Sequence, residues 1–230
     1  MDPTKDEHLI SRLAKFCTNL EFANLPEAVV DKVKQCVLDI LGIFVAGSCT
    51  PTSKQVAEYV RQVAGQPESL IIGHGFRADM CNAAFANGTF GHSIEMDEQH
   101  NPSITHPSPV LVATGLAVGE REGVNGKELI TAIVAGYEVM IRVGMAVAPS
   151  ILVDRGFHPT AVTEYIKFPT GESENPMSKE ALREKFRSLV TPLLPAEKSR
   201  HIESAVEGLE EIENIRKLTQ WMAKTTKTRI

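Results

Sequence analysis

The sequence predicts an all-α protein made of many helices. Apolar residues recur at helical spacing along most of its 230 residues, which is the pattern of helices that bury one face. Residues typical of helix starts (Pro, Asn, Asp and Ser) precede these stretches, and Gly often follows them. One short apolar run, Leu70–Gly73, interrupts the pattern, and we interpret it as a brief strand or an extended connection.

Three helices are expected before the middle of the chain. The first begins after Pro26, keeps apolar residues at helical spacing to about Ala46, and can end at Gly47. The second covers Ser53–Ala64. Asp79 is a suitable N-cap for the third, whose many small residues favour close contact with another helix.

Two helices are expected in the middle of the chain. Pro107–Arg121 is apolar at helical spacing, and proline is well accommodated at the first position of a helix. Asn125 and Glu128 have the spacing of a capping box in which Asn replaces Ser or Thr. The helix that they begin is expected to reach about Ala148.

The last part of the chain starts with a loop, because Phe168–Met177 is polar and rich in turn-forming residues. Ser178 is expected to cap a helix over Lys179–Val190, and Pro195 to open another. A final, more charged helix is expected over Glu210–Met222. Both halves of the chain carry apolar stripes that need partners, so we expect the closing helices to pack against the N-terminal ones.

Composition excludes a few classes of protein. The net charge of −5 and the lack of a dense basic stripe outside Lys224–Arg229 argue against a nucleic-acid binder. The acidic, polar start is not a secretory signal, and we find no apolar run that approaches the length of a membrane span. We therefore expect a cytoplasmic protein without membrane contact, with a mitochondrial location left open. Four widely spaced cysteines are interpreted as reduced thiols: Cys17, Cys36, Cys49 and Cys81.

The most informative part of the chain is Gly91–Pro107, which reads GHSIEMDEQHNPSITHP. Titratable groups crowd this run, and such crowding lowers stability unless a site uses it, because like charges repel and buried charges need partners. Three histidines and three carboxylates lie in it: His92, His100, His106, Glu95, Asp97 and Glu98.

Two histidines directly precede prolines, His106 before Pro107 and His158 before Pro159. Each would be the N-cap of a helix, where the helix dipole and free N–H groups favour negative charge. Each place would offer a histidine able to exchange a proton beside a pocket for an anion such as a carboxylate. Arg155 lies close to the second pair. The alternative is that His-Pro merely ends a loop in both places.

A metal site is a further alternative. Glu95, Asp97, His100 and His106 are side chains that divalent ions use as ligands, but their spacing does not put them on one helix face. We therefore favour a site without a metal, and the metal site stays an alternative. The sequence has no P-loop, GxGxxG or GxSxG motif, so nucleotide binding and serine hydrolysis have no support.

Several segments together resemble the MmgE/PrpD family, which includes 2-methylcitrate dehydratase, cis-aconitate decarboxylase and iminodisuccinate epimerase. The matching segments are LPEAVVDKVKQCVLDILGIFVAG, NAAFANGTFGHSIEMDE, THPS, GYEVMIR and RGFHPT, and GESENPMSKEALREKF is similar to the family's closing segment. The resemblance implies a large helical domain, an inserted smaller α/β domain and pairing as homodimers. It also implies proton transfer at carbon next to a carboxylate, without a metal or organic cofactor.

The resemblance implies roles for particular residues. His106 and His158 correspond to two active-site histidines of the family and are expected to act as acid and base. Asp97 is expected to orient or tune one of them. Arg155 is expected to help hold a carboxylate of the substrate.

The same comparison of motifs also shows departures. Decarboxylases of the family have Asp where Glu95 stands and Thr where Gln99 stands, and this chain has one extra residue before His106. Glu95 and Gln99 are expected to contact the substrate, and a longer acid and an amide would reshape the pocket. We therefore expect 2-methylcitrate dehydration rather than cis-aconitate decarboxylation.

A larger departure follows the second His-Pro pair, where RGFHPTAV runs within a few residues into the closing segment. We therefore expect an internally deleted member, without the rest of the helical domain, the α/β domain, or the lysine and tyrosine that family sites take from the absent stretch. Residues 1–161 would form the N-terminal part of the helical domain, 162–177 a junction loop, and 178–230 C-terminal helices packing on the same domain.

Two functional hypotheses follow. The first is a lyase or isomerase that moves protons on a small di- or tricarboxylate, most similar to 2-methylcitrate dehydratase and acting as a homodimer. Because the cleft would be incomplete, we expect this chain on its own to be inactive or nearly so. The alternative is a catalytically inactive, truncated helical remnant that acts as a dimerisation or interaction protein.

Overall fold

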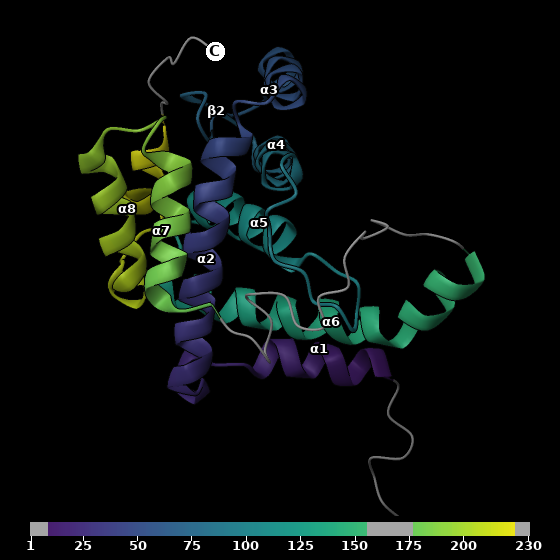
Figure 1. Ribbon diagram of the computed structural model, residues 1–230. Helices are drawn as coiled ribbons and strands as arrows, with labels where there is room; N and C mark the ends of the chain where they lie inside the picture. The colour runs from purple at the N-terminus through teal and green to yellow at the C-terminus, as the bar shows by residue number, and fades with distance from the viewer. Residues whose placement is uncertain (1–8, 156–176, 224–230) are drawn as a thin grey trace, which may run out of the picture.

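The computed structural model describes residues 9–155 and 177–223, except for the side chains of 147–155. Helices make up most of this part of the chain (Figure 1), which confirms the all-α prediction. The α-helices are α1 (Leu9–Asn19), α2 (Glu27–Gly47), α3 (Pro51–Val63), α4 (Met80–His92), α5 (Pro107–Glu122), α6 (Gly126–Arg155), α7 (Lys179–Val190), α8 (Ala196–Glu207) and α9 (Arg216–Thr219). Short 3-10 turns are η1 (Phe22–Asn24), η2 (Leu209–Glu211) and η3 (Gln220–Met222).

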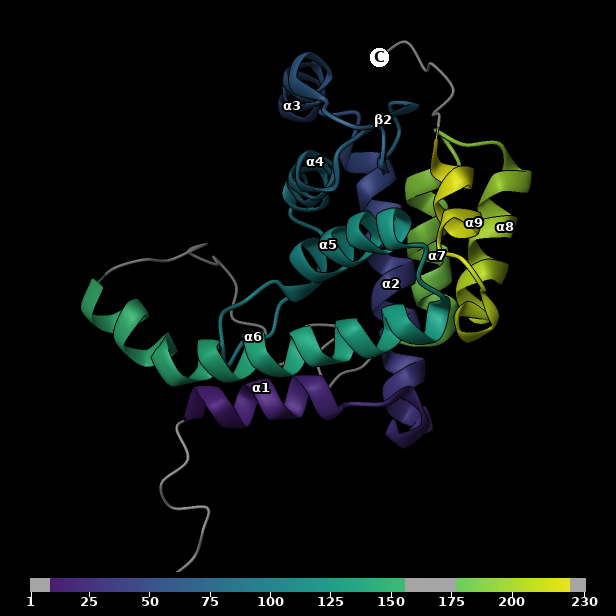
Figure 2. The same ribbon diagram turned by 180° about the vertical axis from the view of Figure 1, so that it is seen from behind.

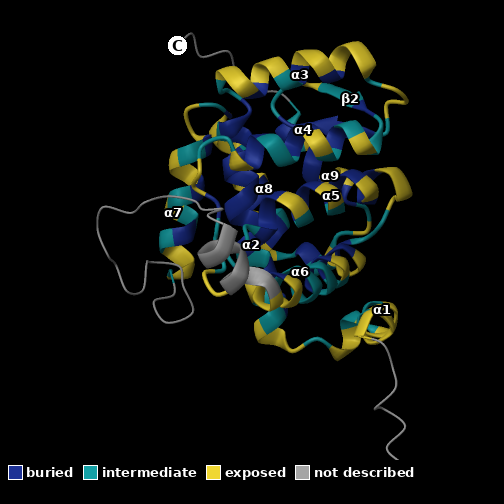
Figure 3. Ribbon diagram, turned by 90° about the vertical axis from the view of Figure 1, so that its right-hand side faces the viewer, coloured by how far each residue is buried: buried dark blue, intermediate teal, exposed yellow. Residues whose placement is uncertain are grey.

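Helix α2 lies at the centre of the fold. Every residue from Cys36 to Val45 is buried, and a helix that is apolar on all sides needs neighbours on all sides. Helices α7 and α8 lie on one side of it, and α4 and α5 on the other (Figures 1 and 2). Buried residues concentrate along α2, whereas α1 and α3 present exposed outer faces (Figure 3).

The closing helix α7 packs directly on α2. The Phe186 side chain is fully buried, and a Cβ atom added at Gly42 would lie 3.0 Å from its ring. Next to it, Lys185 Nζ lies 2.7 Å from Asp39 Oδ1 of α2. Residues from both described parts of the chain therefore share one hydrophobic core.

The apolar run near residue 70 forms part of a small hairpin. Strands β1 (Ser69–Ile71) and β2 (Phe76–Ala78) pair antiparallel. Asn87 of α4 holds this hairpin, because its Oδ1 accepts a hydrogen bond from the Ile72 N–H at 3.0 Å and its Nδ2 donates to the Leu70 carbonyl at 2.9 Å. Two three-residue strands do not change the fold class.

Three of the predicted helix caps are present. Asp79 accepts hydrogen bonds from two backbone N–H groups in the first turn of α4. At the start of α6, Glu128 N–H donates to Asn125 Oδ1 at 3.0 Å and Asn125 N–H donates to Glu128 Oε2 at 2.8 Å, which is the reciprocal capping box. Ser178 caps α7 by accepting one hydrogen bond, from Ala181 N–H at 3.1 Å.

The prediction of one helix over Glu210–Met222 is wrong. The segment consists of η2, a short irregular stretch, α9 and η3. The Ile212 carbonyl accepts a hydrogen bond from Gly126 N–H at 2.7 Å, and Ile215 N–H donates to the Val124 carbonyl at 3.0 Å. These tertiary backbone bonds to the start of α6 replace the bonds that a continuous helix would make.

Helix α6 is longer than the sequence predicts, and its C-terminal part reaches beyond the other helices, with α1 lying alongside (Figure 2). By length and composition alone, Gly126–Ala146 could cross a membrane, a criterion that core helices also meet. The sequence analysis expected no apolar run of that length. Two charged residues, Glu138 and Arg142, interrupt the apolar residues of this helix. The first turns of the helix are buried in the core through Leu129 and Ile130.

Candidate active site

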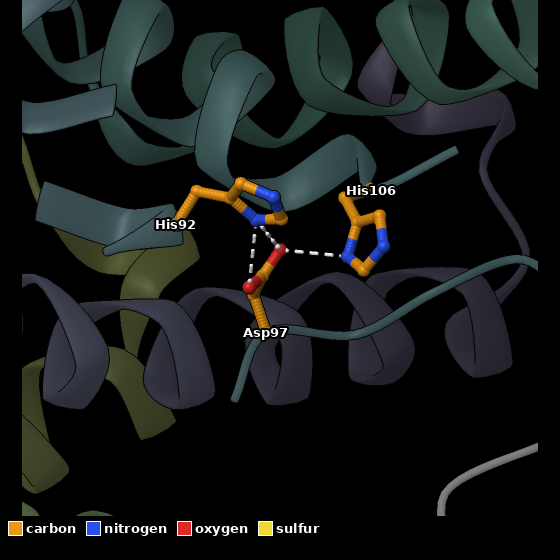
Figure 4. Close-up of side chains that lie close together, drawn as sticks. All are labelled: His92, Asp97 and His106. Atoms are coloured by element: carbon orange, nitrogen blue, oxygen red, sulfur yellow. Dashed lines mark hydrogen bonds and ion pairs between the residues drawn. The ribbon is translucent and has the colours of Figure 1, made fainter. Parts of the chain in front are cut away.

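Three side chains from separate places in the chain meet at one point: His92, Asp97 and His106 (Figure 4). His106 Nδ1 lies 2.8 Å from Asp97 Oδ2, and His92 Nδ1 lies 3.1 Å from both carboxylate oxygens. The two rings contact edge to face, with centroids 4.9 Å apart. The Asp97 side chain is fully buried, whereas those of His92 and His106 are 51% and 34% exposed. One buried carboxylate thus anchors two imidazoles that reach the surface.

Helix ends place the two histidines. His92 is the last residue of α4. Directly before it, Gly91 approaches α2 so closely that a Cβ atom there would lie 2.5 Å from the Phe44 ring. His106 is the N-cap of α5 with Pro107 at the first helical position, as predicted. Its side chain makes no capping hydrogen bond, so the ring nitrogen is available to Asp97.

The loop between these helices has a strained backbone. Among the described residues, Glu95 (φ 47°) and Ile104 (φ 54°) are the two non-glycine residues with left-handed backbone, and both lie in this loop. Such conformations cost about 1–3 kcal/mol each and are typical of functional sites. His100 and Thr105 form an isolated bridge that closes the far end of the loop. Between Glu95 and Ile104, the Asp97 side chain is buried and contacts both histidines.

Helix α7 supports this loop from the other described part of the chain. Lys185 Nζ donates a hydrogen bond to the Met96 carbonyl at 2.7 Å, directly before Asp97 in sequence, while it also pairs with Asp39. Burial raises the pKa of Asp39, Lys185 lowers it, and the charge of Asp97 raises it further. The single lysine therefore pairs with the Asp39 carboxylate of α2 and with a backbone carbonyl of the site loop, and it ties the loop to α2.

Glu98 occupies the start of α5. Its Oε1 accepts a hydrogen bond from Ser108 N–H at 2.9 Å and another from the Tyr137 hydroxyl. The pocket predicted for a substrate anion at this helix start is therefore filled, at Ser108, by a carboxylate of the chain itself. Burial raises the pKa of Glu98, and the hydrogen bonds from Ser108 and Tyr137 oppose the rise.

The raised pKa of Glu98 predicts a pH dependence of stability. Because the fold favours the protonated carboxyl, Glu98 contributes stability that is fully present below its unfolded pKa of about 4.3 and is lost as the pH rises through its folded pKa. The glutamine in Glu98→Gln cannot ionise. As the pH rises through the folded pKa of Glu98, we therefore expect the wild-type protein to lose stability relative to this variant. Urea unfolding of both proteins from about pH 4 to about pH 8 measures the difference. A difference that stays constant with pH would contradict the raised pKa.

The arrangement of the three side chains suits proton transfer. A carboxylate bonded to Nδ1 sets the orientation of an imidazole and leaves Nε2 to accept or donate a proton. The ligand atoms also lie within 4.8 Å of one another, which is the spacing that a metal ion needs. The metal set considered from the sequence is not assembled: Glu95 is exposed, His100 Nδ1 bonds to Ser103 Oγ at 2.8 Å, and His92 stands in their place.

Of the predicted site residues, the structure brings Asp97 and His106 together. Glu95 is exposed and Gln99 is partly buried in the same loop. His158 and the side chain of Arg155 lie outside the described residues. The catalytic and substrate-binding roles of all of them stay predictions.

Sequence reasoning missed His92 as a site residue. A signal was available, because His92 ends the helix that leads into the charged run and stands five residues before Asp97. Its contact with Asp97 depends on the left-handed turn at Glu95, which no local pattern in the sequence indicates.

Comparison with known proteins gives one consistent result. Residues 11–166 match the MmgE/PrpD N-terminal domain. The cis-aconitate decarboxylase-like protein oryM of Aspergillus oryzae is 28% identical over 164 residues, which cover 68% of this chain and 34% of the relative. Cis-aconitate decarboxylase of Mus musculus is 30% identical over 148 residues, 62% of this chain and 30% of the relative. Cis-aconitate decarboxylase of Aspergillus terreus is 24% identical over 166 residues, which cover 70% of this chain and 34% of the relative. The aligned part of the chain thus spans about a third of the length of these relatives.

Proposed function

Because the chain belongs to the MmgE/PrpD family, we propose that it acts as a lyase on a small di- or tricarboxylate by acid–base proton transfer. His106 is the group that exchanges a proton with the substrate, and Asp97 holds its ring. The family relatives named cis-aconitate decarboxylase are lyases, which supports the reaction class.

One observation carries the proposal: the Nδ1 of a partly exposed His106 lies 2.8 Å from the buried carboxylate of Asp97. A hydrogen bond there keeps the ring in one orientation and offsets the charge that forms when Nε2 takes a proton. The proton on the substrate carbon next to a carboxylate can then be removed by a base whose position is fixed. Proton transfer of this kind needs no metal or organic cofactor, and the proposal includes none.

The finer assignment concerns the substrate. The relatives are named for decarboxylation of cis-aconitate, whereas Glu95 and Gln99 in the site loop favour a reshaped pocket. We propose dehydration of a hydroxy-tricarboxylate like 2-methylcitrate, with decarboxylation of cis-aconitate as the competing reaction. Both begin from a small, strongly anionic substrate, and both require a positioned proton donor or acceptor. A cytoplasmic homodimer remains part of this proposal.

The test is a substrate panel with the purified chain at high concentration. 2-Methylcitrate, cis-aconitate and iminodisuccinate are followed by NMR in deuterated buffer, which detects both turnover and deuterium uptake next to the carboxylates. Because the chain spans about a third of the relatives' length, we expect slow turnover of 2-methylcitrate above the uncatalysed background. Turnover of cis-aconitate alone would reverse the finer assignment, and no conversion of any of the three would reject the enzymatic proposal for this chain.

A second candidate function is an interaction protein without activity. It is favoured by the exposed apolar residues of α1, where Leu9 and Ile10 are 67% and 81% exposed, and of the distal part of α6, with Val143 and Met145. Exposed apolar helix faces favour association, here with a second copy of the chain. The molar mass in solution, measured by light scattering after size exclusion, distinguishes a homodimer from a monomer.

A further inference from the structure

The two imidazoles of the site depend on the same carboxylate. His92 Nδ1 is 3.1 Å from both oxygens of Asp97, and His106 Nδ1 is 2.8 Å from Oδ2. With each Nδ1 turned to Asp97, each Nε2 is on the far side of its ring. The carboxylate is fully buried while both rings are partly exposed, so the Nε2 atoms are the polar atoms of the pair that a ligand can reach.

The separation of the rings fits one small substrate. Their centroids are 4.9 Å apart, and the rings stand at 64° to one another. A hydrogen bond to Nε2 adds about 2.6–3.2 Å on each side. A single tricarboxylate can therefore contact both Nε2 atoms, one near the carbon that loses a proton and the other near the leaving oxygen.

The charged groups around the pair leave the Asp97 carboxylate to the two imidazoles. Asp97 brings one negative charge into a buried place, and the cationic side chain nearby, Lys185, lies 2.7 Å from Asp39. Glu98 faces Ser108 and Tyr137 instead. The two imidazoles therefore contact the Asp97 carboxylate through both of its oxygens. Elimination of water needs one group that accepts a proton and another that donates one, and two imidazoles held at one carboxylate can supply both.

We propose that His92 is the second proton-transfer group of this site. This inference rests on the proposed function and supplies a partner for His106 from residues 9–155. In dehydration, the neutral imidazole takes the proton from the carbon next to a carboxylate, and the C–H electron pair forms the C=C bond. The C–O bond breaks, and the charged imidazole gives its proton to the leaving hydroxyl, which departs as water. The two rings end with their protonation states exchanged, and no oxidant or reductant is needed.

The first test compares His92→Gln with His100→Gln as a matched control. His100 lies in the same loop, but its Nδ1 bonds to Ser103 Oγ at 2.8 Å. On the substrate that the wild-type chain converts, we expect His92→Gln to lower kcat about a hundredfold, or to background, with KM changed less than about threefold. His100→Gln should change neither value more than about threefold. A change confined to KM, or equal losses in both variants, overturns the proposal.

A second readout does not need activity. In 15N-histidine NMR, the ring N–H protons of His92 and His106 should both appear in hydrogen bonds and both be lost in Asp97→Asn, while His100→Gln keeps them. If the wild-type chain converts no substrate, the proposed function fails, and these signals then show whether the carboxylate is shared. If both signals are present but no substrate is converted, His92 has no catalytic role although it shares Asp97 with His106. If the His92 signal is missing, both the catalytic role and the shared carboxylate are refuted. Ring signals that shift on addition of EDTA would assign the three side chains to a metal ion and overturn the proposal as well.

Discussion

Replacing His106 by alanine is expected to lower the rate of proton transfer about a hundredfold or more, which is the range for loss of a positioned acid or base. His106 is the N-cap of α5, yet it makes no capping hydrogen bond, so its removal should leave the helix start intact. Its ring bonds to Asp97 at 2.8 Å and is 34% exposed. The expected loss is therefore in kcat rather than in folding. Turnover by NMR and unfolding by urea, measured on the same preparation, separate the two.

The matched control for this prediction is His100→Ala. His100 belongs to the same loop and bonds to Ser103 rather than to Asp97, so this change should leave the rate within about threefold of wild type. Asp97→Asn provides a second comparison, because it keeps the shape of the carboxylate and removes its charge. Wild-type rates in both His106→Ala and Asp97→Asn would remove the proposed mechanism.

Phe186→Ala is expected to destabilise the protein by about 3–5 kcal/mol, the range for removal of a fully buried aromatic side chain. The Phe186 side chain is 0% exposed and packs against α2 where Gly42 leaves room for its ring. A typical domain is stable by only about 5–15 kcal/mol, so this loss would be a large part of the total. Urea unfolding at neutral pH measures it through the shift in midpoint.

Phe85→Ala controls for the chemical change, because the Phe85 side chain is 53% exposed on α4. Substitutions at such surface positions usually stay within about 0.5 kcal/mol of wild type. Similar small effects at both positions would show that α7 does not share the core with α2 in solution. Because Lys185 next to Phe186 holds the site loop, we expect the Phe186 variant to lose turnover at lower urea concentrations than wild type.

Local patterns in the sequence predicted local structure well. The caps at Asp79, Asn125 and Ser178 are present because a capping side chain bonds to backbone groups only two or three residues away. The strong apolar period of α2 likewise predicted its extent to within a residue at its C-terminal end. The prediction of one helix up to Met222 is wrong because backbone bonds from Ile212 and Ile215 to the start of α6 act over a long sequence separation.

The sequence predicted the part of the candidate site that depends on local structure. The sequence indicated His106 as an N-cap and Asp97 as a nearby acid, and the structure pairs them. It did not indicate that Glu98 would occupy the helix start, or that His92 would share Asp97, because both contacts depend on a loop with left-handed backbone at Glu95. Such a conformation is disfavoured for any residue other than glycine, and the surrounding tertiary structure selects it.

The contact between α2 and α4 has a consequence for how this site can change during evolution. A side chain at Gly47 would overlap the Phe90 carbonyl, and one at Gly91 would overlap the Phe44 ring. The first clash is with the backbone of α4 and the second with a ring that is fully buried, so relieving them would shift the end of α4 or displace the Phe44 ring. His92 is the residue that ends α4. The position of the His92 imidazole thus depends on two glycines that allow α2 and α4 to approach closely. Residues around the pocket could change so that other carboxylate substrates bind. We expect the two positions to remain glycine even so, although neither contacts the substrate.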